Sequence, residues 1–549
     1  MGYTNIMLKR AFNLAKKERY KEAEAVLQKI LAKNPTWMAW DMLGIVLDKT
    51  QRHGKAMEAF QQANKLSKNQ PEVIYNMEFC ALNLHQYQLA CECFRSLIDK
   101  RPNDFALWTN LGAAEKALGN FAEALKAFER VCDLKPDFAS GWANRATVLA
   151  GMGTLEKPEA FYRRATELDP KQGSKLAWFL ISEGRYDEAE EFIGEGSQGC
   201  TAKAKILERC GDLEGALETL KVALPHAKTD IKVTLTFARV CRLLKRPQEG
   251  LPLLKAFLQN QQTAASQASI MFEMGHCLDS MGQYAAAFKT FKIANTVENK
   301  PFNMEQYAES IEEGDAWSPG VRSKGSGSGL ILIFGIPRSG TSLCEQILGR
   351  HPLVTPCGER NNLTTIAQDL HKLHWPRVTQ DKINKLSQRY LEGLPSGRVT
   401  DKMPENSLHL NLIHHLLPDA TLVHCVRDPR DSLLSCFTQH FDSARLSWSC
   451  TLGGLSAYHR LWKKITGKRT LFEIAYEDIV TQPENTIRGL LDHCALDFHP
   501  DCLTPHESNR NINTASYAQV KEPIHNRSIG RWRNYETQLG SLLEELKIT

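Results

Sequence analysis

Two patterns of apolar residues divide this chain of 549 residues. In roughly the first 310 residues, apolar positions recur at helical spacing in paired segments, and the pairs repeat about every 34 residues. After residue 330 the pattern changes to short apolar runs such as Leu330–Phe334, each followed by a helical pattern. The first pattern predicts stacked helical hairpins, and the second predicts a parallel sheet with helices on its faces.

The repeated hairpins have a recognisable set of residues. The clearest unit contains Trp108, Leu111, Gly112, Gly119, Ala124, Phe128 and Pro136 at the positions of the tetratricopeptide pattern. Similar sets occur two units earlier, with Trp40, Leu43, Gly44, Ala56, Phe60 and Ala63, and one unit later, with Trp142, Gly153, Tyr162, Ala165 and Pro170. We therefore expect an all-α tetratricopeptide-repeat solenoid over residues 1–313. Such arrays commonly bind peptides on the concave face, and the alternative is that this one only scaffolds the second domain or a homodimer.

A stretch rich in glycine and serine separates the two patterns. Residues 314–329 have the composition of a linker, and residues 330–549 are expected to form an α/β domain with a parallel sheet. The run Leu330–Gly335 leads into a loop that ends at Gly340 and opens a helix. Backbone N–H groups in such a loop, together with the start of the helix, bind phosphate or sulfate.

One position in this loop separates two kinds of chemistry. The spacing from Gly335 to Gly340 matches the phosphate loop of nucleotide hydrolases, but Thr341 stands where those enzymes have a lysine. Arg338 supplies a forked cation instead. A nucleotide kinase stays an alternative, although no acidic residue that could hold magnesium ends the strand predicted at 421–426.

A second anion site is predicted after that strand. Arg427 follows it directly, Asp428 is suited to cap a helix, and Pro429 is suited to its first turn. Ser435 lies about two turns further along, within reach of an anion held by Arg427. Two anion sites at one sheet edge would suit a nucleotide donor with two separated anionic groups.

Composition narrows the remaining classes of function. The net charge is +5 and there is no basic arm, so a nucleic-acid partner is not expected. The sequence shows neither an apolar run of about 20 residues nor an apolar leader, so no association with a membrane is expected. The 15 cysteines are scattered without paired ligand motifs, which favours reduced thiols and a cytoplasmic location. His409, His414, His415 and His424 lack carboxylate ligands at suitable spacing, so no metal is expected.

Residues of about 328 to 535 resemble the sulfotransferase family, most closely its tyrosylprotein branch and bacterial relatives fused to tetratricopeptide repeats. The resemblance rests on Pro356–Arg360, Asp401–Pro404, Ala475–Asp478, Thr514–Val520 and Ser528–Trp532, in addition to the two anion loops. It implies a P-loop-like fold that binds 3′-phosphoadenosine 5′-phosphosulfate (PAPS). Arg338, Ser339, Gly340, Thr341 and Ser342 would hold the phosphosulfate, and Arg427 and Ser435 the 3′-phosphate.

The same resemblance implies the other site residues. Tyr476 would lie near the adenine, Ser516 and Gln519 would belong to a loop that covers the cofactor, and Arg531 would approach the phosphates. Glu359 would be the base, and Lys402, Arg338 and Ser516 would stabilise the transferred and departing groups.

The implied reaction is in-line sulfuryl transfer to a hydroxyl. A tyrosine in a peptide or protein is the favoured acceptor. The alternatives are a sugar, lipid or small-molecule hydroxyl, and a repeat adaptor without catalytic activity.

Overall fold

The computed structural model describes residues 2–84, 86–152, 158–259, 263–297, 302–441, 444–508 and 522–547. The chain divides into two compact units, Met1–Leu176 and Ala177–Thr549, and the division falls inside helix α11 (Gly173–Glu183). The domain boundaries predicted at 313 and 330 stay a prediction, because the structural units follow packing rather than the change in sequence pattern.

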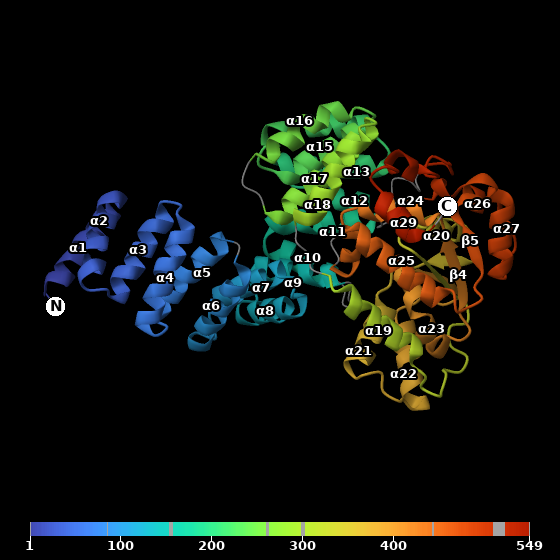
Figure 1. Ribbon diagram of the computed structural model, residues 1–549, viewed down its shortest axis with the longest axis horizontal. Helices are drawn as coiled ribbons and strands as arrows, with labels where there is room; N and C mark the ends of the chain where they lie inside the picture. Colours follow the sequence, from blue (N-terminus) through green and yellow to red (C-terminus); the bar gives the residue numbers. More distant parts are fainter. Residues whose placement is uncertain are drawn as a thin grey trace. The chain divides into compact units, whose positions relative to one another are not determined.

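The first unit consists of successive helical hairpins, drawn from blue to cyan in Figure 1. Its helices are α1 (Gly2–Lys16), α2 (Tyr20–Lys33), α3 (Trp37–Lys49), α4 (His53–Ser67), α5 (Pro71–Asn83), α6 (Tyr87–Lys100), α7 (Phe105–Ala117), α8 (Phe121–Leu134), α9 (Ala139–Met152) and α10 (Glu159–Leu168), followed by the 3-10 turn η1 (Pro170–Gln172).

In the repeat hairpins, a phenylalanine ring on the second helix packs against a glycine on the first helix. A Cβ added to Gly44 would lie 2.4 Å from the Phe60 ring, and one added to Gly112 would lie 2.8 Å from the Phe128 ring. Both phenylalanines are buried. The glycines therefore let paired helices approach closely, which explains why the two residue types recur together.

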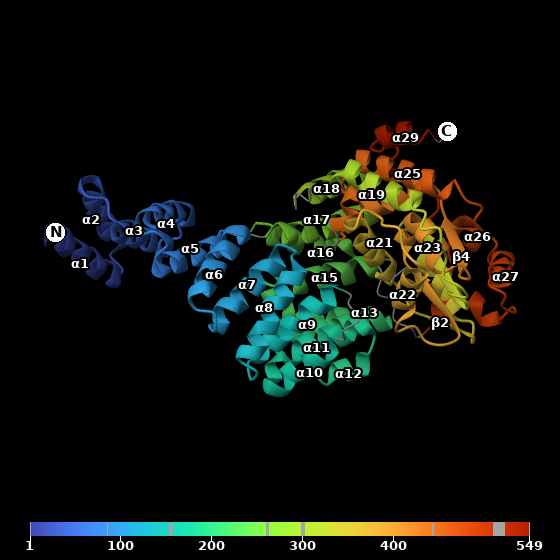
Figure 2. The ribbon, with the colours of Figure 1, turned by 90° about the horizontal axis from the view of Figure 1, so that it is seen from below.

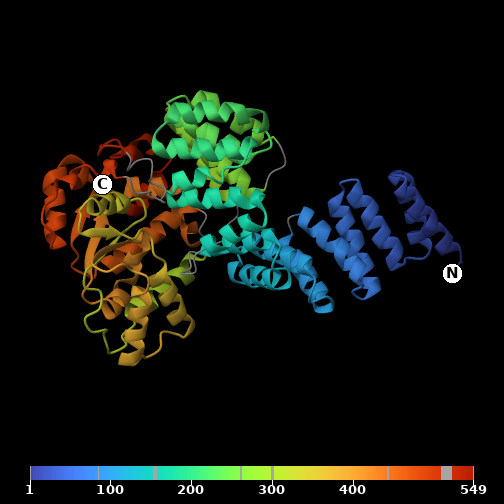
Figure 3. The ribbon, with the colours of Figure 1, turned by 180° about the vertical axis from the view of Figure 1, so that it is seen from behind.

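The second unit begins with further helical hairpins, shown in green from behind in Figure 3. These helices are α12 (Tyr186–Glu190), α13 (Gly196–Cys210), α14 (Leu213–Ala223), η2 (Leu224–His226), α15 (Ile231–Leu243), α16 (Pro247–Phe257), α17 (Ala264–Ser280), α18 (Tyr284–Val297) and α19 (Met304–Ala316). Gly275 and Phe291 repeat the glycine–ring contact of the first unit, since a Cβ added to Gly275 would lie 2.4 Å from the Phe291 ring.

The rest of the second unit is a parallel α/β fold. Its five strands are β1 (Leu330–Gly335), β2 (Val354–Pro356), β3 (Arg398–Lys402), β4 (Thr421–Val426) and β5 (Glu473–Ala475). They form one sheet of order β2-β3-β1-β4-β5 in which every pairing is parallel. All five carboxyl ends therefore lie along one edge, where open α/β sheets bind ligands.

Helices cover both faces of the sheet (Figure 2). On one face, alternate residues of β1 such as Leu332 pack with α21 (Asn362–Lys372), α22 (Gln380–Leu391) and α23 (Leu410–Leu416). On the other face, residues such as Ile333 pack with α20 (Thr341–Gly349) and α27 (Pro483–His493). The remaining elements are η3 (Pro404–His409), α24 (Pro429–Phe437), η4 (Ala444–Cys450), α25 (Leu452–Thr466), α26 (Tyr476–Thr481), η5 (Pro500–Leu503), η6 (Pro505–Glu507), η7 (Arg531–Tyr535) and α29 (Gly540–Leu546).

The last hairpin of the array shares a core with the α/β part. The rings of Phe288 on α18 and Phe437 on α24 stack with centroids 5.0 Å apart, and Tyr284 contacts Tyr535 edge-on. Helix α19 continues through Ala316 into the predicted linker, and the next residue, Trp317, is buried with its indole N–H donating to the Pro376 carbonyl at 3.0 Å. The stretch therefore packs against the domain that follows it.

Two general properties bear on the chain's environment. No helix in the described ranges combines the length and the apolar character needed to cross a bilayer. All fifteen cysteines are free thiols, and most of them are buried.

Candidate active site

The structure brings five of the predicted residues to one edge of the sheet. Glu359 lies three residues after β2, and Lys402 is the last residue of β3. Arg338 lies in the loop after the central strand β1, Arg427 directly follows β4, and Tyr476 directly follows β5. The strand order therefore places Glu359 and Lys402 on one half of the sheet edge and Arg427 and Tyr476 on the other.

The loop after β1 has the geometry of an anion cradle. Arg338 and Gly340 adopt left-handed backbone conformations, with φ of 74° and 98°, and α20 begins at Thr341. A Cβ on Gly340 would lie 3.0 Å from the Tyr476 ring, so close approach to the neighbouring loop also favours glycine here. The hydroxyl of Ser339 is buried and has no hydrogen-bond partner among the described residues.

Arg338 is held from the side by the helix after β4. Its Nε donates a hydrogen bond to Ser435 Oγ at 2.9 Å. Burial lowers the pKa of Arg338 to about 10, and the nearby charge of Arg427 acts in the same direction. The guanidinium is therefore still charged at neutral pH, and binding of an anion would offset the cost of burying it.

Arg427 connects three parts of the site. Its Nη1 donates to the Arg338 carbonyl at 3.0 Å, its Nη2 donates to the Ser528 carbonyl, and its guanidinium lies 4.7 Å from the centre of the Tyr476 ring. Its Nε is buried and unpartnered within the described part of the chain. Arg427 thus fixes the anion loop and still has a donor to offer.

Glu359 and Lys402 are in direct contact. The Lys402 ammonium donates to Oε1 of Glu359, and the Lys402 backbone N–H donates to the Gly358 carbonyl at 2.8 Å. The Lys402 side chain is 1% exposed, whereas that of Glu359 is 42% exposed. A buried cation therefore orients a carboxylate that is open to a ligand.

Glu345 on α20 supports this pair and was not predicted from the sequence. Its Oε1 accepts hydrogen bonds from the Gly358 N–H at 2.9 Å and from the Thr400 hydroxyl at 2.8 Å, and it is 4% exposed. The available signal was an acidic residue on a predicted helix beside apolar Leu343, Cys344 and Ile347. A buried carboxylate in such a setting needs partners.

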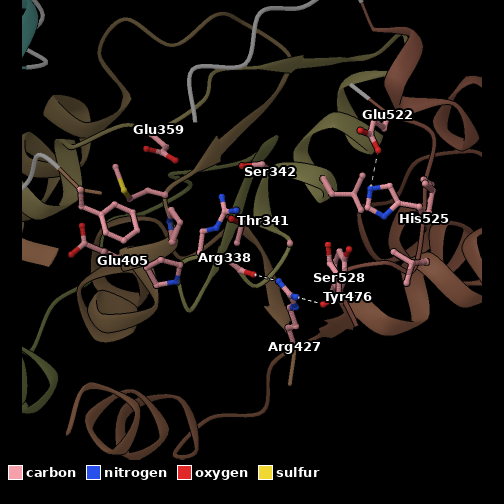
Figure 4. A pocket seen from close by; sticks show the side chains of 18 of the residues that line it. Arg338, Thr341, Ser342, Glu359, Glu405, Arg427, Tyr476, Glu522, His525 and Ser528 are labelled. Carbon is pink, nitrogen blue, oxygen red and sulfur yellow. Dashed lines mark hydrogen bonds and ion pairs between the residues drawn. The ribbon is translucent and has the colours of Figure 1, made fainter. Parts of the chain in front are cut away.

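Arg338, Glu359, Arg427 and Tyr476 line a cavity of about 230 Å³ (Figure 4). Its described lining is Pro337, Arg338, Gly340, Thr341, Ser342, Leu343, Glu359, Met403, Pro404, Glu405, Arg427, Phe441, Leu446, Tyr476, Val480, Glu522, Pro523, Ile524, His525 and Ser528. In Figure 4, Glu359 and Glu405 lie on one side of Arg338, whereas Tyr476 and His525 lie on the other.

Among the predicted site residues that the structure describes, Ser339, Lys402, Ser435 and Arg531 are not part of the cavity lining. Arg531 instead pairs with Asp279 on α17, with Nη2 at 2.7 and 2.5 Å from the two carboxylate oxygens. Ser516 and Gln519 lie outside the described residues. The sequence could not reveal the Arg531 pairing, because Asp279 lies 252 positions away in the helical array.

Two of the histidines for which no metal is predicted form hydrogen bonds within the protein. His415 Nδ1 lies 3.0 Å from the Val321 carbonyl, and His424 Nδ1 lies 3.1 Å from Glu473 Oε1. Within the described ranges no group of three or more His, Cys, Asp or Glu side chains could hold a metal ion. The expectation that no metal is needed stays a prediction.

The chemistry of the cavity fits an anionic nucleotide. Arg338 and Arg427 supply two guanidinium groups, and the loop supplies backbone donors at the start of α20. The buried Ser339 hydroxyl and the buried Arg427 Nε are unpartnered polar atoms in the described structure, as expected where a ligand completes the hydrogen bonds.

Segments of both parts of the chain match known protein families. Residues 331–500 match the sulfotransferase family. Residues 105–138 and 139–172 match tetratricopeptide repeats, and residues 4–110 match the C-terminal ARM domain of tetratricopeptide repeat protein 21. The predicted repeats and the predicted sulfotransferase fold are confirmed.

Curated proteins are similar to part of the chain. An uncharacterized protein of Aquifex aeolicus is 28% identical over 345 residues, which cover 55% of this chain and 44% of that protein. A putative protein-tyrosine sulfotransferase of Caenorhabditis briggsae is 24% identical over 37% of this chain and 80% of its own length. Protein-tyrosine sulfotransferase 2 of Gallus gallus is 22% identical over 37% of this chain and 62% of its own length.

Solved structures of other proteins match part of the chain. The tetratricopeptide-repeat protein YrrB, described as having an unusual peptide-binding site, superposes on 30% of this chain and 85% of its own, with 21% identity and a TM-score of 0.29. These matches show what the chain is similar to: it combines tetratricopeptide repeats with a domain that matches the sulfotransferase family and is similar to the protein-tyrosine sulfotransferases.

Proposed function

We propose that this protein transfers the sulfuryl group of PAPS to an acceptor hydroxyl, and that the acceptor is a tyrosine in a peptide or protein. The observation that carries the proposal is the contact between Glu359 and Lys402 beside a cavity that also contains the Arg338 loop. A base and an anion cradle at one sheet edge are the two requirements of sulfuryl transfer to a hydroxyl.

The donor would lie across the cationic half of the cavity. Arg338 and the loop residues Ser339, Gly340, Thr341 and Ser342 would hold the phosphosulfate, Arg427 and Ser435 the 3′-phosphate, and Tyr476 the adenine. When bound, PAPS supplies a sulfuryl group on a phosphate that can leave. The assignment of individual contacts, including those of Ser516 and Gln519, is part of the proposal.

On the other half of the sheet edge, Glu359 would accept the proton of the acceptor hydroxyl. A tyrosine hydroxyl has an ordinary pKa near 10, so a positioned base favours its reaction at neutral pH. Lys402 holds Glu359 in place through a charge-assisted hydrogen bond. The Lys402 ammonium, Arg338 and Ser516 would also counter negative charge on the transferred and departing groups.

The same proposal extends to the repeat array, the oligomeric state, the location of the protein and its need for a metal. The repeat array would help to hold the peptide or protein acceptor, and homodimer formation and a cytoplasmic location stay predictions. The free cysteines are compatible with a reducing compartment. The reaction needs no metal in this scheme, because Lys402 and the two arginines supply the positive charge.

The decisive experiment measures transfer from labelled PAPS to tyrosine peptides. Glu359→Gln is expected to lower kcat by about 10²- to 10⁴-fold, because it removes the base but keeps the size of the side chain. Calorimetry with adenosine 3′,5′-bisphosphate should show that donor-site binding survives. Glu392→Gln, an exposed carboxylate of the same domain, is the matched control. Full activity of Glu359→Gln would contradict the assigned role, and labelling of sugars or lipids but not of peptides would contradict the assigned acceptor.

A further inference from the structure

Residues 528–535 form a segment, called here the C-terminal strap, that contributes to the nucleotide half of the cavity. Ser528 lines the cavity, and its carbonyl accepts a hydrogen bond from Nη2 of Arg427 (Figure 4). Nη1 of the same guanidinium donates to the Arg338 carbonyl at 3.0 Å. The orientation of Arg427 therefore depends on where the C-terminal strap lies.

One carboxylate holds the backbone of the C-terminal strap from within the α/β part. Asp431 on α24 is 2% exposed, and its two oxygens accept the N–H groups of Gly530 at 2.6 Å and of Trp532 at 2.9 Å. Gly530 has a φ of 70°, which favours glycine. Arg531 lies between these two anchored residues.

A second carboxylate holds the C-terminal strap from the helical array. Asp279, near the end of α17, accepts hydrogen bonds from Arg531 Nη2 at 2.7 and 2.5 Å and from the Tyr535 hydroxyl at 2.5 Å. The Tyr535 ring also packs edge-on against Tyr284 of α18, with centroids 5.4 Å apart. Burial lowers the pKa of Arg531, but the charge and the hydrogen bond of Asp279 outweigh this effect and raise the pKa overall.

This contact differs from an ordinary surface ion pair. Exposed pairs of single side chains contribute little to stability. The Asp279 side chain is only 15% exposed, and it receives donors from two residues of the C-terminal strap. Arg531 is three positions after Ser528, so the contact holds the chain close to the carbonyl on which Arg427 depends.

We infer that Asp279 is a positioning residue for the donor: by holding Arg531, it fixes the C-terminal strap and with it the Arg427 guanidinium. This inference rests on the proposed function, because it assigns the Arg427 half of the cavity to a nucleotide. A site that is fixed before its ligand arrives binds more tightly, since less freedom is lost on binding. The hairpin of α17 and α18 is then a part of the donor site, although none of its residues is in the described cavity lining.

Calorimetry with adenosine 3′,5′-bisphosphate tests this role without catalysis. Asp279→Ala is expected to raise Kd roughly three- to tenfold, because Arg531 and Tyr535 lose their acceptor. Asp279→Asn keeps an oxygen for the Tyr535 hydroxyl but not the ion pair, and should cause a smaller increase. Glu312→Ala is the matched control, since Glu312 on α19 pairs with Lys464 on α25 at 2.7 Å and also joins the array to the α/β part. Its Kd should equal that of wild type.

A double variant tests whether Asp279 acts through Arg531. Arg531→Ala should weaken binding to a similar extent, and its combination with Asp279→Ala should add little, because both changes remove the same contact. Thermal melts define a temperature at which the compared proteins are folded. If Asp279→Ala does not fold, Asp279→Asn and Arg531→Ala decide the result.

Three results overturn the inference. They are wild-type affinity in the Asp279 variants, losses that add in the double variant, and tighter binding by Asp279→Ala, which would mean that Asp279 keeps Arg531 away from the donor. The expected affinities without sulfuryl transfer to any peptide would count against the proposed reaction and not against the role of Asp279. Failure of the wild-type protein to bind the bisphosphate would contradict both the proposed donor and the inference.

Discussion

Glu345 accepts a hydrogen bond from the backbone N–H of Gly358 at 2.9 Å, so the helix behind the anion loop fixes the residue next to Glu359. The donor loop and the proposed base are thereby parts of one hydrogen-bonded assembly. Glu345 touches neither reacting group, and we regard it as a positioning residue.

Glu345→Ala is expected to lower kcat roughly tenfold or more, because the Gly358 N–H and the Thr400 hydroxyl lose their acceptor and the base is no longer held. Glu345→Gln keeps an oxygen acceptor and should restore most of the rate. Steady-state kinetics with labelled PAPS would measure both. Equal activities of the alanine and glutamine variants would argue against positioning.

Arg338→Lys tests the anion loop. Lysine keeps the charge but cannot donate to Ser435 through Nε and also present a fork to an anion. Calorimetry should show roughly tenfold weaker binding of adenosine 3′,5′-bisphosphate. Ser435→Ala, which removes only the supporting hydroxyl, should have a smaller effect. Unchanged binding by Arg338→Lys would remove Arg338 from the donor site.

The shared core predicts where the chain can be shortened. Removal of residues 1–176 leaves the second compact unit whole, and this variant should unfold cooperatively. Removal of residues 1–316 also takes away Phe288, which stacks on Phe437, and Asp279, which binds Arg531 and Tyr535. For the fragment that lacks residues 1–316, thermal unfolding should lose its cooperativity, or size-exclusion chromatography should show aggregation. A stable fragment of residues 317–549 would contradict this expectation.

The buried Asp401 predicts a pH-dependent stability. Burial raises its pKa from 3.8 to about 7, so between these values the folded state binds more protons than the unfolded state. Its contribution to stability is therefore greatest below pH 4 and is lost as pH rises toward 7. Asp401→Asn removes the free-energy cost of ionising a buried carboxyl group at higher pH. The asparagine oxygen can still accept the hydrogen bond of the Tyr390 hydroxyl.

Thermal melts at pH 5 and pH 8 would measure the effect of Asp401→Asn. The melting temperature of the variant minus that of wild type should be higher at pH 8 than at pH 5. Comparison with wild type at each pH cancels the opposing contribution of His409, whose pKa burial lowers to about 4. An equal difference at the two pH values would show that Asp401 is not titrating in this window.

Features that depend on one strand and the loop after it were predictable from the sequence. Glu359, Lys402, Arg338 and Arg427 each lie at or soon after a strand end, and a parallel sheet brings such ends together. The structure accordingly places Glu359 against Lys402, although 43 positions separate them.

Features that depend on packing between distant segments were not predictable in this way. The apolar neighbours of Glu345 suggest burial but not its partners, and only the tertiary structure shows that Glu345 and Glu405 are both buried beside the cavity. The partner of Arg531 lies in the helical array, because α17 and α18 pack on the C-terminal segment. Local pattern contains no information about that contact.

The strand order has a consequence for how this domain could evolve. Glu359 and Glu405 follow β2 and β3, neighbours at one end of the sheet, whereas Arg427 and Tyr476 follow β4 and β5 at the other. Substitutions in the first two loops can alter the choice of acceptor and leave the second pair of loops intact. Under the proposed function, duplicated copies of this domain could diverge in what they modify while they continue to draw on the same donor.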